Sequence, residues 1–407
     1  MCEEAELNPL KYDVIVVGAG PAGLLSAGTI ARKGYDVAVF EEHASIGRPV
    51  HCAGLLSSSG LAGLGLNPPE HVVQNQVEGA RIYSPACDNI EIRRGRREAI
   101  VVDRGAFDRW LAESAESEGA RIMTDSKIES VSITETRVEV HLQRSHSPTR
   151  GEVLVNAEGS RCQISQDIGL PAVPRSSKLA AYQYEMSNVD IDEKQVEMFY
   201  GRHLAPGFFA WIIPLGNNRA RVGLASRNQT MTRLKRGMKH HPVLSRRLQN
   251  ASVDRGLGGV VLVGRPIERT YDTRAVVVGD AAGHVKATTG GGVILGGQAA
   301  ELAGETVVDA LEREDLSADS LAQYETRWRR ELGSEFLMMW LAQKALTSLS
   351  DKGLNRLISG ARDLQLQDVI GREGDMDRQA KVIRALIQDP RMFLLGLDVI
   401  RFLSPLF

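Results

Sequence analysis

This sequence has few aromatic residues, few cysteines and almost no net charge. Its 407 residues include nine Phe, eight Tyr and four Trp. The four cysteines lie far apart without a CxxC pair, which argues against a zinc site and, at this chain length, against a disulfide framework. The formal net charge of −2 provides no overall basic field to attract nucleic acid. We therefore expect neither a metal site nor a nucleic-acid partner.

The sequence also lacks a segment with the pattern of a signal peptide or a membrane span. The first residues are acidic and polar, unlike a signal peptide. The C-terminal apolar stretch from Met392 to Phe407 is interrupted by Asp398, Arg401 and Pro405, which leaves it too short and too charged to cross a bilayer. We expect a cytoplasmic protein.

Glycine, in contrast, is abundant, with 40 residues. The glycines show no three-residue period, which excludes a collagen-like fibre, and a hydrophobic content of 43% excludes disorder. At roughly 150 residues per domain, the length suggests two or three domains. Ten glycines lie in 18–65 and eight in 279–304, so the excess is gathered in two stretches where the backbone can approach a ligand.

The first glycine-rich stretch has the order of a dinucleotide-binding unit. A continuous apolar run, 12–17, predicts a buried parallel strand and leads into Gly18, Gly20 and Gly23. Gly18 permits a tight turn, Gly20 lets a pyrophosphate approach the backbone, and Gly23 lets the following helix pack on the strand. A second strand ends at Glu41, where a carboxylate can accept hydrogen bonds from a ribose diol. The alternative is a glycine turn followed by a solvated glutamate.

The second stretch follows a predicted strand at 275–278. Asp280 stands just beyond that strand, where its carboxylate suits a polyol hydroxyl. Gly290, Gly291 and Gly292 then open a long helix, and their N–H groups would stabilise negative charge on an electron-rich ring. A capped turn with Asp280 as the N-cap is the simpler interpretation of the same residues.

Three further segments complete a resemblance to a known family. Residues 47–57 (GRPVHCAGLLS) resemble a G-x-P-V-x-C segment, 102–108 (VDRGAFD) a V-[DE]-R-x-x-F-D segment, and 206–214 (PGFFAWIIP) a Y-x-W-x-F-P segment. Together with the glycine-rich motifs they resemble, over most of the chain, the geranylgeranyl reductase family of glutathione-reductase-like, FAD-dependent oxidoreductases. The resemblance is closest to the archaeal branch, which saturates digeranylgeranyl glycerophospholipid precursors of membrane lipids.

The chain departs from the family pattern at the proposed substrate motif. Phe209 replaces the tyrosine and Ile213 replaces the phenylalanine, while Trp211 and Pro214 are kept. The family's A-D-G segment carries Glu158 in place of the aspartate. These differences bear on which substrate fits the site more than on the fold.

The resemblance implies an α/β fold in three parts. A glutathione-reductase-like Rossmann domain that binds FAD is expected from residues 1–66, 98–170 and 266–345. An inserted, mostly β substrate domain is expected from 67–97 and 171–265, with one basic helical piece near 231–249. A helical region is expected from 346 to 407.

The resemblance also implies a set of site residues. FAD is expected to contact Gly18, Gly20, Ala22, Gly23, Glu41, Glu42, Arg48, Cys52, Ala53, Gly54, Arg104, Ile128, Asp280, Gly290, Gly291, Gly292 and Val293. Arg48 and Arg104 are candidates for bidentate contacts with its phosphates, with surface salt bridges as the alternative. The substrate is expected to contact Tyr182, Tyr184, Phe209, Trp211 and Pro214.

An isoprenoid double bond is not conjugated to a carbonyl, so its reduction requires a hydride at one carbon and a proton at the other. Cys52 is the candidate catalytic residue, because a thiol is protonated at neutral pH and can donate. The alternative is a small buried hydrophobic residue packed against the flavin ring. For the neighbouring His51 we favour an ordinary surface role.

No motif in the sequence identifies the electron donor. Gly256, Gly258 and Gly259 follow no clear strand and open no clear helix, so we interpret them as a turn rather than a second nucleotide fingerprint. Ferredoxin and NAD(P)H both stay open as donors.

Two basic patches, 93–97 and 235–247, have two interpretations. Such runs are usually solvated faces, but they can also contact anionic lipid headgroups, which would make the protein peripheral at the membrane surface. The C-terminal apolar positions likewise suit core packing, or the closure of a prenyl tunnel. Two other functions stay open: a flavin-dependent aromatic monooxygenase, which shares the fold, and a non-catalytic prenyl-binding escort protein.

Overall fold

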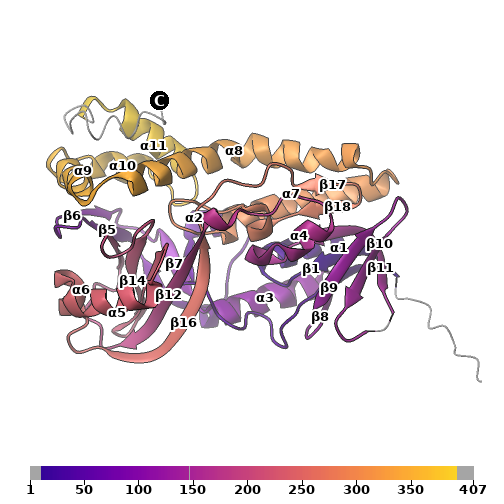
Figure 1. Cartoon of the computed structure of the whole chain (residues 1–407), viewed down its shortest axis with the longest axis horizontal. Helices are drawn as coiled ribbons and strands as arrows, with labels where there is room; N and C mark the ends of the chain where they lie inside the picture. The colour runs from indigo at the N-terminus through magenta and orange to yellow at the C-terminus, as the bar shows by residue number, and fades with distance from the viewer. Residues whose placement is uncertain (1–10, 146, 392–407) are drawn as a thin grey trace, which may run out of the picture.

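The structure is a computed structural model that describes residues 11–145 and 147–391. Two large sheets lie side by side, and the long helix α8 (Ala318–Ser348) extends along both of them (Figure 1). The C-terminal apolar stretch from Met392 and the polar N-terminal segment both lie outside the described residues.

The eight-stranded sheet is built around parallel strands, as the dinucleotide-binding motif predicts. Strand β1 pairs in parallel with β2 on one side and β11 on the other. Its central residues, Val14 to Val17, are buried because helices cover one face, while residues of β9, β10 and the short helix after β11 pack on the other. The strands are β1 (Lys11–Val17), β2 (Val37–Phe40), β8 (Arg121–Met123), β9 (Ile128–Ile133), β10 (Val138–Leu142), β11 (Thr149–Asn156), β17 (Tyr271–Asp272) and β18 (Ala275–Val277).

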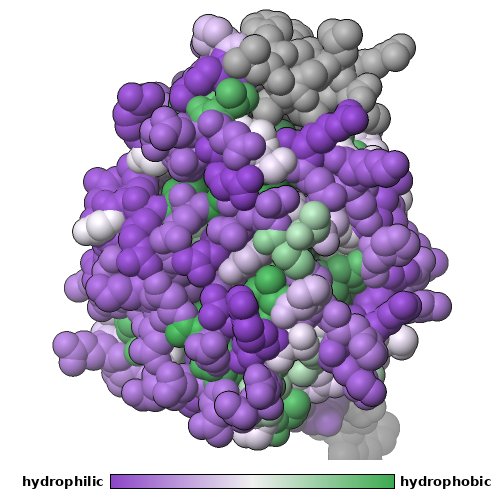
Figure 2. Space-filling model, turned by 90° about the vertical axis from the view of Figure 1, so that its left-hand side faces the viewer, coloured by the Kyte–Doolittle hydropathy of each residue, from purple (hydrophilic) through white to green (hydrophobic). Residues whose placement is uncertain are grey.

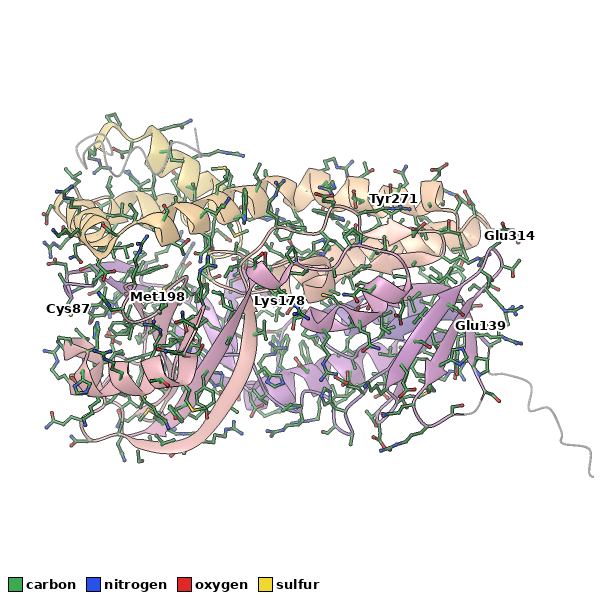
Figure 3. All side chains as sticks on the ribbon, viewed as in Figure 1. Cys87, Glu139, Lys178, Met198, Tyr271 and Glu314 are labelled. Atoms are coloured by element: carbon green, nitrogen blue, oxygen red, sulfur yellow. The ribbon has the colours of Figure 1, made fainter. Side chains whose placement is uncertain are left out.

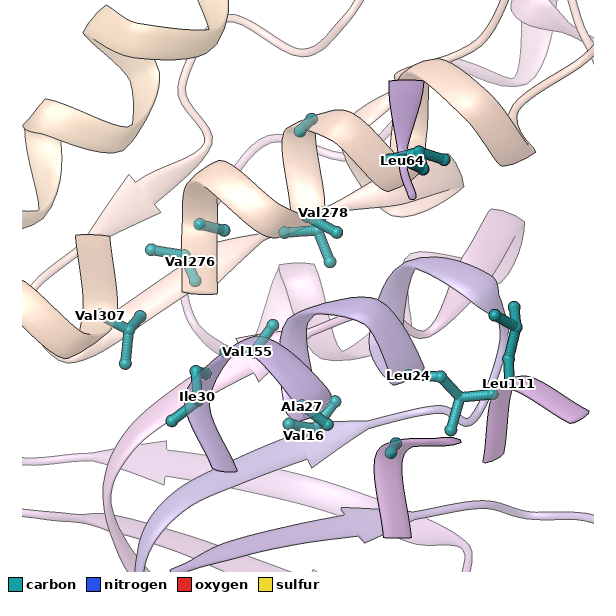
Figure 4. Packing of buried hydrophobic residues seen from close by; sticks show 14 of the residues in the cluster. Val16, Leu24, Ala27, Ile30, Leu64, Leu111, Val155, Val276, Val278 and Val307 are labelled. Carbon is teal, nitrogen blue, oxygen red and sulfur yellow. The ribbon is translucent and has the colours of Figure 1, made fainter. Parts of the chain in front are cut away.

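One face of this sheet carries the main hydrophobic core. Helices α1 (Pro21–Ala31), α3 (Arg104–Ser117) and α7 (Val293–Glu312) pack there, with Ile30 of α1 and Val307 of α7 fully buried (Figure 4). Burial of an aliphatic side chain of this size contributes about 1.5–3 kcal/mol. The short helix α4 (Gln163–Asp167) packs on the opposite face. This core fixes the ends of β1, β2 and β18, where the glycine-rich loops begin.

The seven-stranded sheet has the order β16-β12-β15-β14-β13-β5-β6. One face packs against α5 (Thr230–His240) and α6 (Pro242–Arg247), which divide the predicted basic helical piece at a proline. The strands are β5 (Gly79–Tyr83), β6 (Asn89–Arg93), β12 (Lys178–Ser187), β13 (Gln195–Tyr200), β14 (Phe209–Gly216), β15 (Arg219–Ser226) and β16 (Ser252–Leu262).

The interpretation of Gly256, Gly258 and Gly259 as a turn is wrong. All three lie within β16, which pairs with β12 along its length. A Cβ at Gly256 would lie 2.2 Å from the Tyr182 hydroxyl oxygen, and one at Gly259 would lie 3.1 Å from the His51 carbonyl oxygen. Close packing in a strand therefore requires glycine at 256 and favours it at 259, whereas a Cβ at Gly258 would make only an ordinary contact of 3.7 Å with Tyr182.

A three-stranded sheet, β3 (Leu55–Ser57), β7 (Ala99–Val102) and β4 (Val73–Val77), connects the two large ones. Strands β4, β5 and β6 all fall within the proposed substrate domain. Strands β5 and β6 pair into the seven-stranded sheet, whereas β4 pairs with β7 of the proposed FAD domain. The domain boundaries stay a prediction.

Helices α9 (Asp351–Asp363), α10 (Gln367–Glu373) and α11 (Gln379–Gln388) follow α8, and short α2 (Ser58–Gly63) follows β3. Ile90 of β6 packs with Ile358 of α9 and Leu366, so the C-terminal helices cover the end of the seven-stranded sheet. Within 11–145 and 147–391, no helix combines the length and the hydropathy required to cross a bilayer.

Candidate functional site

A cavity of about 980 Å³ is shared by the two large sheets and the C-terminal helices. Its wall is mostly apolar, and its volume is at the top of the range of about 300–1,000 Å³ for small-molecule sites. The wall includes the loops after β1 and β2 and side chains of α9, α10 and α11. Met198 of β13, labelled in Figure 3, also belongs to it.

The loop after β1 is shaped by its glycines. Gly18 has a φ of +94°, and a Cβ there would lie 2.6 Å from the Ala157 carbonyl oxygen. A Cβ at Gly23 would lie 2.0 Å from the Gly18 carbonyl oxygen, so α1 packs directly on the turn. A Cβ at Gly20 would meet no atom within 4 Å, and Gly20 lines the cavity. The backbone therefore leaves room for a phosphate at the N-terminus of α1.

Glu41 follows β2 and lines the cavity beside this turn. One carboxylate oxygen accepts a hydrogen bond from the Ala19 N–H at 2.9 Å, and the other accepts one from the His43 N–H at 3.0 Å. The His43 ring also contacts this second oxygen through Nδ1, so two backbone N–H groups and the ring fix the carboxylate, while the first oxygen keeps a lone pair for a ribose hydroxyl. Glu42 pairs with Arg161 at the same part of the wall.

Asp280 lies in the short 3-10 helix Gly279–Ala282 that follows β18, and it lines the cavity. Burial raises the pKa of its carboxyl, and the charge of Arg104 opposes that shift. A Cβ at Gly292, just before α7, would lie 2.6 Å from the Asp280 Oδ1. The carboxylate and the N-terminus of α7 are therefore neighbours on the wall. An open glycine turn, two carboxylates placed for hydroxyl groups and a bare helix N-terminus fit FAD.

Arg104 begins α3 and contacts Asp108 and Cys52. Its guanidinium donates to both carboxylate oxygens of Asp108 at 3.0–3.1 Å. Burial lowers the pKa of Arg104, but Asp108 and Cys52 outweigh burial and hold that pKa above its usual value. Burial raises the pKa of Asp108 against the charge of Arg104. The guanidinium is thus paired with Asp108 while it lines the cavity, and the bidentate contact of Arg104 with a phosphate stays a prediction.

The loop that carries Cys52 is held by a residue that sequence reasoning missed. Arg221 of β15 is 1% exposed and donates to the Ala53 carbonyl oxygen at 2.7 Å and the Val102 carbonyl oxygen at 3.2 Å. Its Nε donates to Glu185 Oε1 at 3.1 Å. Arg221 therefore ties the seven-stranded sheet to the loop after β2. No spacing in the sequence signals this contact, which joins residues 168 positions apart.

The aromatic wall meets the second glycine stretch directly. A Cβ at Gly290 would lie 2.4 Å from Val261 Cγ1 and 3.6 Å from Phe208 Cζ. Phe208 stacks on Phe209 with ring centroids 4.2 Å apart, and the Trp211 indole N–H donates to Gln183 Oε1 at 3.2 Å. The apolar face of the sheet is thus brought against the loop expected to hold the flavin ring.

Side chains alternate between the two faces of a strand, so only part of the predicted substrate wall faces the cavity. Phe209 and Trp211 line the cavity. Tyr184 and Pro214 do not, because they lie on the face covered by α5 and α6. Tyr182 contributes to the wall, but its ring packs edge-on against Tyr184 on that other face.

Gln183, between the two tyrosines, faces the cavity together with Ala181 and was missed. Every residue proposed to contact FAD lines the cavity, namely Gly18, Gly20, Ala22, Gly23, Glu41, Glu42, Arg48, Cys52, Ala53, Gly54, Arg104, Ile128, Asp280, Gly290, Gly291, Gly292 and Val293.

A buried ion pair closes the cavity beside the second glycine stretch, and sequence reasoning missed this too. Lys286 Nζ lies 2.6 Å from Asp377 Oδ1 and 3.2 Å from the Met376 carbonyl oxygen. Thr288 donates to Gln379 at 2.7 Å. The segment between α10 and α11 is therefore bound to the loop that precedes α7, and it carries the apolar side chains of α11 into the wall.

Comparison with known proteins agrees with this arrangement. The family model described as "Lycopene cyclase protein" matches residues 13–369. The chain is 32% identical to digeranylgeranylglycerophospholipid reductase 2 of Methanopyrus kandleri, with 89% of this chain and 92% of that protein covered. It is 32% identical to the digeranylgeranylglycerophospholipid reductase of Methanothrix thermoacetophila, with 94% and 98% covered.

Among solved structures, a geranylgeranyl bacteriochlorophyll reductase-like protein from Thermoplasma acidophilum superposes with a TM-score of 0.86 at 26% identity, covering 98% of this chain and 100% of that one. A flavin-dependent brominase superposes with a TM-score of 0.72 at 18% identity, covering 93% and 98%, which shows a shared fold alone. From the geometry and these relatives, the chain is an FAD-dependent oxidoreductase that belongs to the geranylgeranyl reductase family.

Proposed function

We propose that this enzyme saturates the C=C bonds of geranylgeranyl chains, specifically those of archaeal-type ether phospholipid precursors. The observation that carries the proposal is the continuity of one cavity from the FAD loops to an apolar region between the seven-stranded sheet and the C-terminal helices. A long hydrocarbon chain fits such a region because the described wall offers it apolar side chains rather than hydrogen bonds. These include Ala80, Ile82, Ile92, Val196, Met198, Leu346, Leu357, Ile370, Ile383 and Leu386.

Bound reduced FAD would supply a hydride to one alkene carbon and become oxidised, while a proton reaches the other carbon. The prenyl chain would thereby gain two hydrogens. The residues of this protein hold the alkene in line and exclude water. Positive charge that develops on the tertiary carbon would face Phe209 and Trp211, and an aromatic face contributes about 0.5–2 kcal/mol to such stabilisation. Alignment within the closed cavity contributes further.

Two cavity residues carry a transferable proton close to this wall. Cys52 accepts a hydrogen bond at Sγ from the Gly54 N–H at 3.4 Å and lies beside Arg104. Tyr200 is directly opposite Phe209 in the β13–β14 pair, and burial raises the pKa of its hydroxyl. The side chains of both residues line the cavity. We favour Cys52, because its loop also contacts the proposed FAD site.

Cys52→Ala is expected to lower the rate of alkene reduction by about 100-fold or more, as loss of a general acid does. Tyr200→Phe is expected to leave the rate within about threefold, since it removes one hydroxyl without a general-acid role. Single-turnover reduction of a geranylgeranyl substrate, with FAD content measured in each variant, makes the comparison. The opposite pattern would assign the proton to Tyr200 and remove Cys52 from the chemistry.

The electron donor and membrane contact belong to the same proposal. Ferredoxin and NAD(P)H are compared by supplying each to the purified enzyme and following flavin reduction. The basic residues of α5 and α6 are proposed to hold the protein at anionic membrane surfaces, since each adds about 1 kcal/mol near such a surface. Neither a monooxygenase nor an escort function is favoured by the named relatives.

The activity is tested in a host that makes geranylgeranyl ether lipids. Mass spectra of its lipids are expected to shift upward in steps of two hydrogens when the chain is expressed. Unchanged lipid masses, with FAD-loaded protein present in the cells, would contradict the proposal.

A further inference from the structure

A second, smaller pocket of about 380 Å³ opens beside the main cavity. Its lining residues are Ser59, Arg94, Arg96, Arg97, Glu98, Gly374 and Asp375. Arg94, Glu98, Gly374 and Asp375 line the main cavity as well. The small pocket is therefore adjacent to the large one and shares these four residues of its wall. The apolar region under α9 to α11 thus has a polar neighbour at the loop between β6 and β7.

The carboxylates of this pocket already have protein partners. Glu98 accepts hydrogen bonds from Arg94 at 2.9 Å and from Arg96 at 2.7 Å. Asp375 accepts one from the Ser59 hydroxyl at 3.0 Å, and its other oxygen accepts the N–H groups of residues 377 and 378. Both acids are thereby committed to structural contacts, and the pocket holds three arginines against two carboxylates.

The guanidinium groups of the arginines have fewer protein hydrogen-bond partners than the carboxylates have. Arg94 is mostly buried and donates to the Gly374 carbonyl oxygen at 2.6 Å as well as to Glu98, so it fixes the pocket between β6 and the segment after α10. The Arg96 side chain is 66% exposed and contacts Glu98 through Nε. Arg97 is exposed and forms no ion pair with any residue in 11–145 or 147–391. The fork of Arg96 and the whole of Arg97 are available to an anion.

We propose that this pocket binds the phosphate of the lipid substrate, with Arg96 and Arg97 as its ligands, while the prenyl chains occupy the apolar part of the main cavity. The inference rests on the proposed function and adds the recognition of the substrate's head group. Guanidinium groups match phosphate oxygens bidentately, and they keep their charge at any physiological pH. An apolar cavity with a basic pocket at its side suits an amphiphile with an anionic head.

The surface at the end of the molecule that carries β6 and α9 is mostly hydrophilic, and apolar side chains appear between the hydrophilic ones (Figure 2). A head group held at Arg96 and Arg97 would set how far each prenyl chain extends toward Gly290. Anchoring would therefore select which double bonds reach the flavin.

The test compares two substrates in neutral detergent micelles, where no anionic membrane is present. The variant Arg96→Gln/Arg97→Gln is expected to raise KM for digeranylgeranylglyceryl phosphate by about 10- to 100-fold, the cost of losing one or two charged hydrogen bonds. KM for geranylgeraniol, which has no phosphate, is expected to stay within about twofold, as for an ordinary surface change. The control Lys33→Gln/Arg313→Gln removes the same charge from two exposed positions that line neither pocket, and it is expected to change neither KM.

Further measurements separate the possible sources of the effect. Inorganic phosphate is expected to compete with the lipid phosphate in the wild type and to lose that effect in the Arg96/Arg97 variant. Normal KM values in micelles, with weakened flotation of the variant on anionic vesicles, would assign the arginines to membrane headgroups and overturn the proposal. Equal losses on both substrates, or a lowered melting temperature, would assign a structural role and also overturn it. If the wild type reduces neither substrate, the proposed function itself fails.

Discussion

Gly20→Val is expected to leave the protein folded and to weaken FAD binding by about 10- to 100-fold. Gly20 has φ −77° and ψ 171°, which any residue adopts, and a Cβ there would meet no protein atom within 4 Å. The added side chain would occupy the space where a pyrophosphate approaches the N-terminus of α1. Displacing that group breaks a charged hydrogen bond, which is worth about 1.5–3 kcal/mol. Titration of the apoprotein with FAD measures the loss.

Two glycines of the same helix provide matched controls. Gly28→Ala is expected to bind FAD normally, since its Cβ would contact Ala115 at an ordinary 3.6 Å. Gly23→Val is expected to lower the melting temperature or prevent folding, because its Cβ would lie 2.0 Å from a backbone oxygen. Normal FAD affinity in folded Gly20→Val would mean that the pyrophosphate does not lie at this turn.

Arg221→Met is expected to destabilise the protein by about 3 kcal/mol, at the lower end of the range of about 3–5 kcal/mol for removal of one partner of a buried ion pair. The lower end applies because Arg255 stays bound to Glu185, with its Nε 2.7 Å from Oε2. The variant also removes the donor to the Ala53 carbonyl, so the Cys52 loop shifts. A displacement of about 1 Å can reduce the rate by up to about 100-fold. Chemical denaturation and single-turnover reduction report the two effects separately.

Arg247→Met is the control for the loss of a buried ion pair alone. Arg247 lies 2.8 Å from Glu197, which is 1% exposed, but it sits on α6 and does not contact the Cys52 loop. A comparable loss of stability is expected, with the rate of alkene reduction unchanged. If both variants lose stability and keep the wild-type rate, Arg221 does not position Cys52.

The features predictable from the sequence are those whose chemistry is local. The strand, turn and helix around Gly18 to Gly23 follow from a pattern contained in about twenty residues. The structure places Asp280 beside Gly292 because a single strand-to-helix connection carries both.

The features that could not be predicted from the sequence depend on contacts between residues far apart in the chain. Lys286 and Asp377 are 91 positions apart, and their ion pair depends on how the four intervening helices, α7 to α10, pack. A strand motif does not state which side of the sheet carries a given parity, so the sequence does not reveal that Tyr184 and Pro214 lie on the face away from the cavity. Glycine in a strand and glycine in a turn give the same composition signal, so composition does not identify the strand glycines at 256–259.

The central claim is that reduced FAD in this protein transfers hydride to an isoprenoid double bond. The most direct measurement is an anaerobic single turnover of the purified FAD-loaded enzyme, with the flavin reduced beforehand, mixed with digeranylgeranylglyceryl phosphate. The flavin is expected to be reoxidised at the rate at which the lipid gains two hydrogens, one double bond for each flavin. A flavin that stays reduced beside the lipid, with no change in lipid mass, and that reoxidises only when oxygen is admitted would contradict it.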